Sequence, residues 1–403
     1  MVSVLERATL FRETLPEQEQ KRIVGGSLMA AAKSGPLTAN SLLGEVNRGV
    51  KEFVERPEAE YVLATSVSVR HFSELDDVEI AGCTLSFGRY LPDFLRDAHD
   101  ESKERTREYI FGEYPDQSSL LRHYTAVWVN VSARSEHEAL SKGLAALDLQ
   151  RGIWNFALNR RKWERTTNQR RKPVNPVLLG PVHSLHHPDG TLASAFDWYE
   201  YDYVEPTQSN ELKKRWKRVQ RDEAGAWRCL DKSRYRPELE VFIRRYTKAL
   251  DTREWDAAFV QLWGLLEDLT GTKPGESHMV TIKRASFLYR DTERDLHHQV
   301  LTHLKSYRNS SVHAGEGSSS IEAYLYQLKR YVEQVLEYHL MSGHNFPSIE
   351  ETARFLDQPA DINAIDQKVA DLQAKVEEQQ AEVERAKKAR EFHTPIEENS
   401  EPE

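Results

Sequence analysis

Cysteine and long apolar runs are scarce in this sequence, and each shortage excludes a class of protein. The two cysteines, Cys83 and Cys229, have no CxxC spacing, so neither a disulfide framework nor a zinc ribbon is expected. The early apolar stretch Ile23–Ala32 is short and interrupted by glycines, so it fits neither a signal peptide nor a membrane span. We therefore expect a soluble, cytoplasmic protein with no membrane partner.

The glycine-rich phosphate loops of nucleotide-hydrolysing enzymes are also missing. Neither GxxxxGK[ST] nor GxGxxG occurs, so nucleotide hydrolysis is not indicated and no cofactor is expected. The net charge of −9 argues against a protein that binds nucleic acid over its whole surface. It still allows a local basic groove, because salt screens charges over about 10 Å. A length of 403 residues favours two folded domains.

The first 230 residues combine strand and helix patterns. Runs of β-branched and apolar residues predict five strands, at 61–69, 78–87, 124–131, 176–185 and 191–204. Asp189-Gly190, between the last two, is typical of a hairpin turn. Ser135 and Glu138 form a capping-box pattern that predicts a helix to about residue 159. The fold class is therefore α+β, with an antiparallel sheet in an N-terminal sensing or regulatory domain over 1–230.

The pattern becomes helical over residues 231–345. Apolar residues recur at helical spacing in four segments, at 237–250, 255–269, 295–312 and 321–340. Glycine-containing turns follow the second and third segments, as helix C-termini prefer. This pattern predicts an all-α domain built as a four-helix-type bundle.

The C-terminal part predicts a linker over 346–360, a coiled coil over 361–390 and a tail over 391–403. One heptad position holds Ile362, Val369, Val376 and Val383, and the next holds Ile365, Leu372, Gln379 and Ala386. β-Branched residues at the first position favour a two-stranded coiled coil; the alternative is a frayed amphipathic helix. The tail is acidic and broken by proline, so it is expected to be disordered.

One short segment, Tyr307–Gly315, carries residues suited to cutting RNA without a metal. In that reaction the 2′-hydroxyl attacks the adjacent phosphorus and leaves a 2′,3′-cyclic phosphate. His313 is suited to the proton transfers, because the unperturbed pKa of histidine is about 6.5. Arg308 is suited to the charged phosphate, because a guanidinium is permanently charged and bidentate.

The spacing of Arg308 and His313 limits how they can meet. Five residues on an ideal helix turn by about 500°, so the side chains point about 140° apart and lie about 7.5 Å apart along the axis. Either the helix ends before His313, which Gly315 favours, or the site is a groove shared between two subunits. The purely structural alternatives are a surface salt bridge for Arg308 and a helix C-terminal cap for His313.

These residues carry a resemblance to a known family. An arginine, a polar residue, three more residues and a histidine, late in a helical bundle, resemble the Rx4–6H motif of HEPN domains. Leu262–Leu269 resembles the second helix of the Apea-like HEPN branch. The β-rich N-terminal half resembles the regions that precede such modules in bacterial antiviral proteins.

The resemblance implies a homodimeric, metal-independent ribonuclease. Arg308 and His313 would take the catalytic positions and Asn309 the supporting polar position. Glu267 would orient the arginine or the histidine from the neighbouring helix. Such proteins commonly act as toxins or antiviral effectors that cut tRNA or other cellular RNA, but HEPN modules without catalytic activity also exist.

Basic and aromatic side chains elsewhere are candidates for contacts with RNA phosphates and bases. These candidates are Lys283, Arg284, Lys305 and Tyr307 around the motif, and Arg160, Arg161 and Lys162 in the N-terminal half. A second basic stretch lies at 213–218. The alternative is that these side chains only solvate helix ends and loops.

A metal site is not expected. Three histidines and an aspartate surround the predicted hairpin turn, namely His183, His186, His187 and Asp189. Strand alternation would place His186 and His187 on opposite faces of the sheet, which separates them as ligands.

Together with these patterns, the resemblance to HEPN domains implies an effector of bacterial antiviral defence or abortive infection. It would bind and cut RNA, form a homodimer or a higher homo-oligomer, and respond to a phage-derived or other protein trigger. The alternative is a non-catalytic HEPN dimerisation scaffold, whose N-terminal domain binds a protein or a small ligand. Toxicity on overexpression would favour the ribonuclease.

Overall fold

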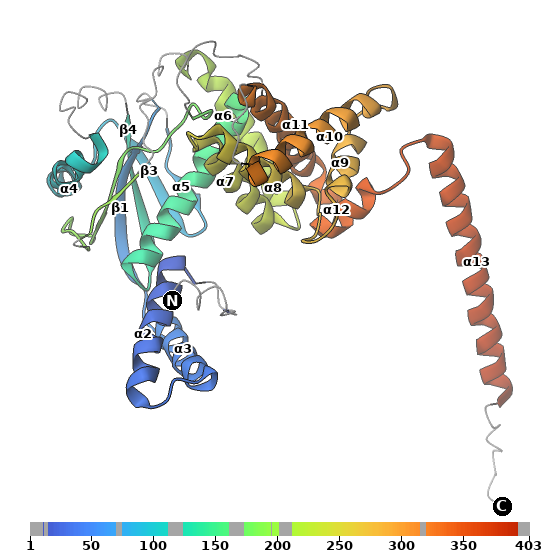
Figure 1. Ribbon diagram of the computed structural model, residues 1–403, viewed down its shortest axis with the longest axis horizontal. Helices are drawn as coiled ribbons and strands as arrows, with labels where there is room; N and C mark the ends of the chain where they lie inside the picture. Colours follow the sequence, from blue (N-terminus) through green and yellow to red (C-terminus); the bar gives the residue numbers. More distant parts are fainter. Residues whose placement is uncertain are drawn as a thin grey trace, which may run out of the picture.

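The computed structural model describes residues 11, 15–69, 75–111, 124–160, 173–194, 196–200, 212–314 and 320–393, without the side chains of 107–111, 212–214 and 310–314. In this part of the chain, an antiparallel sheet with flanking helices adjoins a helical bundle, and a long C-terminal helix extends away from both (Figure 1). None of the described helices is long and apolar enough to cross a membrane.

The sheet is antiparallel throughout its described strands, as the sequence predicts, in the order β2-β3-β4-β1-β5-β6. The strands are β1 (Ala59–Val67), β2 (Val78–Ile80), β3 (Cys83–Gly88), β4 (Thr125–Ala133), β5 (Val182–His186) and β6 (Trp198–Tyr199). β1 lies in the middle and pairs with β4 in a register that sets Leu63 opposite Val129.

The single strand predicted over 78–87 is in fact the hairpin of β2 and β3. Ala81 and Gly82 form its turn, and their φ angles are 51° and 77°. Positive φ at both central residues is what a tight two-residue hairpin turn requires. The apolar run 78–87 therefore has the pattern of one strand but reverses direction at Ala81. The sequence does not indicate this turn, because few L-residues adopt a positive φ.

The strands predicted over 176–185 and 191–204 are much shorter in the structure, where only β5 and β6 form. Pro181 precedes β5 and has no backbone N–H to donate to a ladder. The Asp189-Gly190 turn is confirmed, because the Gly190 N–H donates to the carbonyl of His187 at 2.9 Å. Residues 201–204 lie outside the described part of the chain.

Different helices cover the two faces of the sheet (Figure 1). Side chains alternate along β1, so Leu63 packs beneath α5 (Glu136–Asn159), while Val62 packs with Leu95 of α4 (Asp93–Phe111) on the other face. The predicted helix over 135–159 is confirmed, since Ser135 Oγ accepts the N–H of Glu138 at 3.2 Å. A helical hairpin of α2 (Glu17–Ser34) and α3 (Ala39–Val54) precedes the sheet and was not predicted.

All four helices predicted for the bundle are confirmed. They are α7 (Arg236–Asp251), α8 (Trp255–Leu269), α10 (Asp291–Ala314) and α11 (Ile321–Ser342). Two further helices, α6 (Leu212–Lys232) and α9 (His278–Phe287), join them. α8 is the central helix, because Phe259, Leu262 and Leu266 are completely buried and it packs against α7, α9, α10 and α11.

The hydrophobic core runs without interruption from the sheet into the bundle. α5 packs on the sheet with one side and on α7 with the other (Figure 1). The two helices approach closely at Gly152, where a Cβ atom would lie 2.5 Å from Thr247 Oγ1. The predicted domain limits at residues 230 and 345 stay predictions. Buried side chains on both sides of residue 230 belong to one core, so the packing marks no boundary there.

The segment after the bundle differs from the expected linker. Within 346–360, α12 (Ile349–Leu356) packs against α9 and buries Ala353 and Leu356. α13 (Ile362–His393) follows, and none of its residues is buried. The first three residues of the predicted tail, 391–393, are helical, and 394–403 lie outside the described part of the chain.

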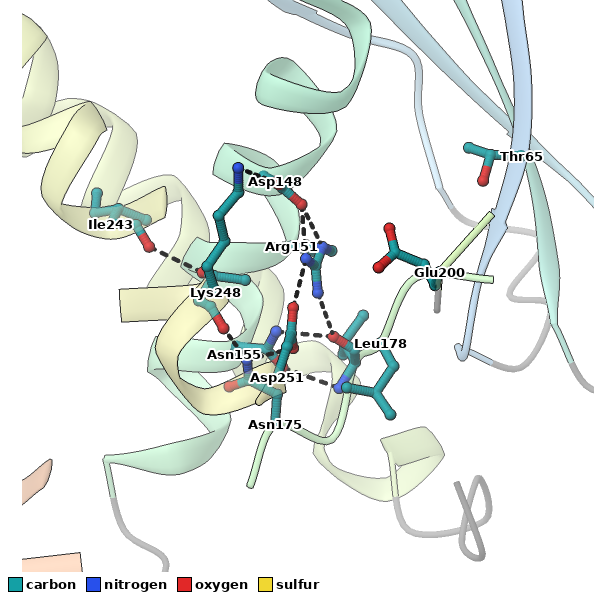
Figure 2. A network of polar contacts seen from close by, with 12 residues as sticks. Thr65, Asp148, Arg151, Asn155, Asn175, Leu178, Glu200, Ile243, Lys248 and Asp251 are labelled. Carbon is teal, nitrogen blue, oxygen red and sulfur yellow. Dashed lines mark hydrogen bonds and ion pairs between the residues drawn. The ribbon is translucent and has the colours of Figure 1, made fainter. Parts of the chain in front are cut away.

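A buried polar network joins the sheet layer to the bundle (Figure 2). The Arg151 side chain on α5 is only 1% exposed. Its guanidinium donates to Asp148 at 2.6 and 2.8 Å and to Asp251, the last residue of α7, at 2.6 Å. Asn175 donates to the other oxygen of Asp251 at 2.7 Å. Burial alone would lower the pKa of Arg151, but the two carboxylates raise it, so the guanidinium stays charged.

We expect Arg151→Met to lower the free energy of unfolding by about 3–5 kcal/mol, because it leaves two carboxylates partly or fully buried without their cation. Urea denaturation followed by circular dichroism measures this. The matched control is Arg218→Met on α6, whose half-exposed ion pair with Asp222 is 3.6 Å long; its effect should stay within about 1 kcal/mol. An Arg151→Met protein as stable as the control would contradict the role given to this network.

Candidate functional site

Arg308 lies near the end of α10 and is half-buried. Its Nη1 donates weakly to Asn309 Oδ1 at 3.4 Å. Among the residues that the structure describes, Arg308 forms no ion pair, and its Nε is buried without a hydrogen-bond partner. The surface salt bridge considered for Arg308 is therefore not formed with any described carboxylate.

The helix continues through His313. α10 ends at Ala314, so the expectation that the helix stops before His313 is wrong. On an ideal continuous helix the positions of Arg308 and His313 lie about 140° apart around the axis. The His313 side chain and Gly315 lie outside the described part.

Tyr307 was predicted to contact RNA, but the structure gives it a packing role. It is 9% exposed, and its hydroxyl donates to Asp256 Oδ1 at 2.5 Å. Its ring lies edge-on to Phe259, with 5.0 Å between the centroids. Both contacts are on α8. Tyr307 therefore fixes α10 against the central helix and sets the position of Arg308 beside it.

Glu267 was predicted to orient Arg308 or His313, but its described contacts are different. Its Oε1 accepts a hydrogen bond from Trp263 Nε1 at 2.9 Å and pairs with His278 Nδ1 at 2.5 Å. His278 begins α9 and is half-buried. A carboxylate on one nitrogen orients an imidazole, so Glu267 and His278 form a dyad that the sequence did not indicate.

Arg284 was predicted to guide RNA phosphates, but it is a structural clamp. It is 9% exposed, and it makes a two-bond pair with Asp357 at 2.7 and 3.0 Å. Its Nη1 donates to the carbonyls of Thr270 and Gly271 at 3.0 and 2.9 Å. These contacts tie α9 to the end of α8 and to the end of α12, so Arg284 has no free face for a phosphate.

Two other predicted RNA contacts, Lys283 and Lys305, remain near the surface. Lys283 is exposed on α9, and its charge contributes to lowering the pKa of Asp357. Lys305 is half-buried on α10, and its Nζ lies 3.8 Å from Met279 Sδ on α9. Arg308 lies one turn beyond Lys305. Lys283 therefore lies on α9, and Lys305 lies on α10, the helix that also carries the motif.

Each basic residue predicted to contact RNA in the N-terminal half either forms an ion pair within the chain or lies outside the described part. Arg160 pairs with Glu337 of α11 at 2.6 Å, which joins the ends of α5 and α11. Arg161 and Lys162 lie outside the described residues. In the stretch 213–218, Trp216 of α6 is buried against the ring of Trp154, so it is not available to stack on an RNA base.

The histidines near the Asp189-Gly190 turn do not gather around a common point. His186 is completely buried and His187 is exposed, as strand alternation predicts. Within the described residues no group of three or more histidine, cysteine or acidic side chains is arranged to hold a metal ion. The sequence did not single out His99, which lies against β5 and is considered below with the cavity that it lines.

Comparison with known proteins adds no relative. No family model, no curated protein and no solved structure matches this chain. The likeness to HEPN domains therefore rests on the motif and on the order of the helices around it.

We expect Arg284→Met to lower the free energy of unfolding by about 2–4 kcal/mol, because two backbone carbonyls and Asp357 lose a charged donor. Lys283→Met, on the same helix and exposed, should change it by at most about 0.5 kcal/mol. Thermal and urea denaturation of both variants measure the difference. Equal stability of the two variants would show that Arg284 is not the clamp described.

Proposed function

We propose that this chain is a metal-independent endoribonuclease that acts as a homodimer in bacterial antiviral defence. The observation that carries the proposal is the half-buried guanidinium of Arg308, which no described carboxylate neutralises. A cation held in this way suits the charge that develops on a pentacoordinate phosphate. His313 would take the proton of the attacking 2′-hydroxyl or supply the proton for the departing 5′-oxygen.

A second copy of the chain would complete the site. Since Arg308 and His313 point about 140° apart on α10, a two-fold axis beside this helix would bring the arginine of one copy to the histidine of the other. Lys305 and Lys283 on the α9–α10 pair would extend the positive strip along which RNA phosphates lie. tRNA is the substrate class that the HEPN resemblance suggests.

α13 supports association into dimers. Its heptad positions Ile362, Val369, Leu372 and Val376 are 47–69% exposed, and no described residue covers them. A helix with such a stripe buries it against a partner helix, and β-branched residues at the first heptad position favour two strands. The same observation favours the second candidate function, a non-catalytic dimerisation scaffold whose N-terminal half binds a protein or small ligand.

RNA cleavage by purified protein distinguishes the two candidates. We expect the wild type to cut bacterial tRNA in the presence of EDTA and to leave 2′,3′-cyclic phosphate ends. Arg308→Ala and His313→Ala should each slow cleavage by about 100-fold or more. Arg253→Ala, at an exposed arginine between α7 and α8, is the matched control and should cut like the wild type. Intact RNA with every protein, while all remain dimeric, would favour the scaffold.

A mixture of the two inactive variants tests the shared groove. In a heterodimer of Arg308→Ala and His313→Ala chains, one of the two composite sites contains both natural residues. Co-expression should therefore restore about one quarter of the wild-type activity, because half of the dimers are mixed and each has one intact site. No recovery would mean that each chain uses its own pair.

The heptad stripe makes a separate prediction. We expect Val369→Asp with Val376→Asp to weaken or abolish the dimer, because it buries charge in the seam between two helices. The matched control is Ala370→Asp with Ala374→Asp, which adds the same charge on the outer side of α13. Light scattering after size-exclusion chromatography measures the mass. A dimer that survives the double valine change would show that α13 does not hold it together.

A further inference from the structure

A cavity of about 330 Å³ lies on the face of the sheet that α4 covers, away from the motif on α10. The described residues that line it include the basic side chains of Arg89, Arg96 and Lys103 and one acidic side chain, Asp100. The ring of His99 also lines it, although this residue is only 2% exposed. The volume falls in the range of small-ligand sites.

A chain of hydrogen bonds decides which nitrogen of His99 is available to the cavity. His186 Nδ1 lies 3.0 Å from the carbonyl of Gly190, which can only accept, so Nδ1 carries the proton. Burial lowers the pKa of His186, so its ring is neutral and Nε2 is an acceptor. The hydroxyl of Ser184, 2.8 Å away, donates to that Nε2.

The same reasoning extends to His99. Ser184 has one proton, which it gives to His186, so its oxygen must accept from His99 Nδ1 at 2.6 Å. Burial, then the charge of Lys103, lowers the pKa of His99 far below its usual value. The ring is therefore neutral and Nε2 carries the lone pair. Among the described residues no group donates to this nitrogen.

The cations around the cavity are only partly neutralised. Lys103 pairs with Asp100 at 3.0 Å, and Arg96 pairs at 2.6 Å with Asp93, which does not line the cavity. Arg89 is exposed and lies over the ring of Tyr90, at 5.2 Å, without a described carboxylate partner. With Asp93 and Asp100 counted against them, these three cations keep a net charge of +1 (three positive, two negative), which suits an anion in a protein whose net charge is −9.

We propose that this cavity binds a small phosphate ester that also carries a free hydroxyl, of the class of a ribonucleoside monophosphate. The phosphate group lies on Arg89, Arg96 and Lys103, since guanidinium and ammonium groups are its usual partners. The hydroxyl donates to His99 Nε2, which has a lone pair and no proton. A ligand with no donor would not form this hydrogen bond, at a cost in affinity.

Calorimetric titration of the full chain with the four ribonucleoside 5′-monophosphates, ribose and inorganic phosphate tests the proposal. We expect at least one nucleotide to bind, and ribose not to bind. Arg89→Met and Lys103→Met should each weaken nucleotide binding about tenfold or more. The matched control is Lys51→Met on α3, which is 73% exposed and away from the cavity; it should bind like the wild type.

Ser184→Ala tests the histidine chain separately from the cations. It frees His99 to place its proton on either nitrogen, so we expect weaker binding of the nucleotide and unchanged binding of inorganic phosphate. Thermal denaturation checks that each variant is folded. The proposal is overturned if no nucleotide binds the wild type at millimolar concentration, or if Arg89→Met and Lys103→Met bind it unchanged. Neither result depends on whether the protein cuts RNA.

Discussion

The rest of this structure depends on the ion pair network of Arg151. A guanidinium that is 1% exposed is tolerated only where carboxylates and carbonyls satisfy it, and here these come from α5, from the end of α7 and from the loop of Asn175 and Val177. The three segments belong to the sheet layer, the bundle and the connection between them. Any shift of one against another would break charged hydrogen bonds in a dry interior. The network therefore specifies how the sheet and the bundle meet.

The same constraint explains why many basic residues that look suited to RNA are not available to it. Buried or half-buried cations must have partners, and the bundle supplies them within the chain. Arg284 holds α9 to α8 and α12, and Arg160 holds α5 to α11. The buried Lys329 pairs with Glu333 at 2.8 Å and donates to the carbonyl of Asn159 at 2.9 Å. Arg308 differs from these, because no described side chain neutralises it. The proposed role of the motif depends on this difference.

Two places in the molecule thus hold a cation that no described carboxylate neutralises. On α10 the Nε of Arg308 is buried and has no hydrogen-bond partner among the described residues. On the α4 side of the sheet, a cavity has cations and an imidazole whose tautomer is set by two neighbours. The first suits a long phosphate chain and the second a small ligand, and the continuous core between them runs through α5. A ligand in the cavity would contact β1 and α4; β1 is packed on that same core, whereas Leu95 of α4 belongs to a separate apolar cluster on the other face of the sheet.

The sequence by itself determined the local elements whose patterns are strong. The four bundle helices agree with their predicted limits to within about four residues, as periodic segments usually do, and the antiparallel sheet follows from alternating strands. The sequence could not show that 78–87 reverses at Ala81, because alanine rarely adopts positive φ. It also could not show that α6 is helical, because the basic residues of this segment obscured the apolar face of Trp216, Val219 and Leu230. It also placed Glu267 beside the motif, whereas the folded chain pairs it with His278. Only the tertiary structure decided which side chains meet: His99 and Ser184 are 85 residues apart, and Arg151 and Asp251 are 100. Periodicity reports which face of an element is buried, but partners across such distances are chosen by packing and by the need to satisfy each buried charge.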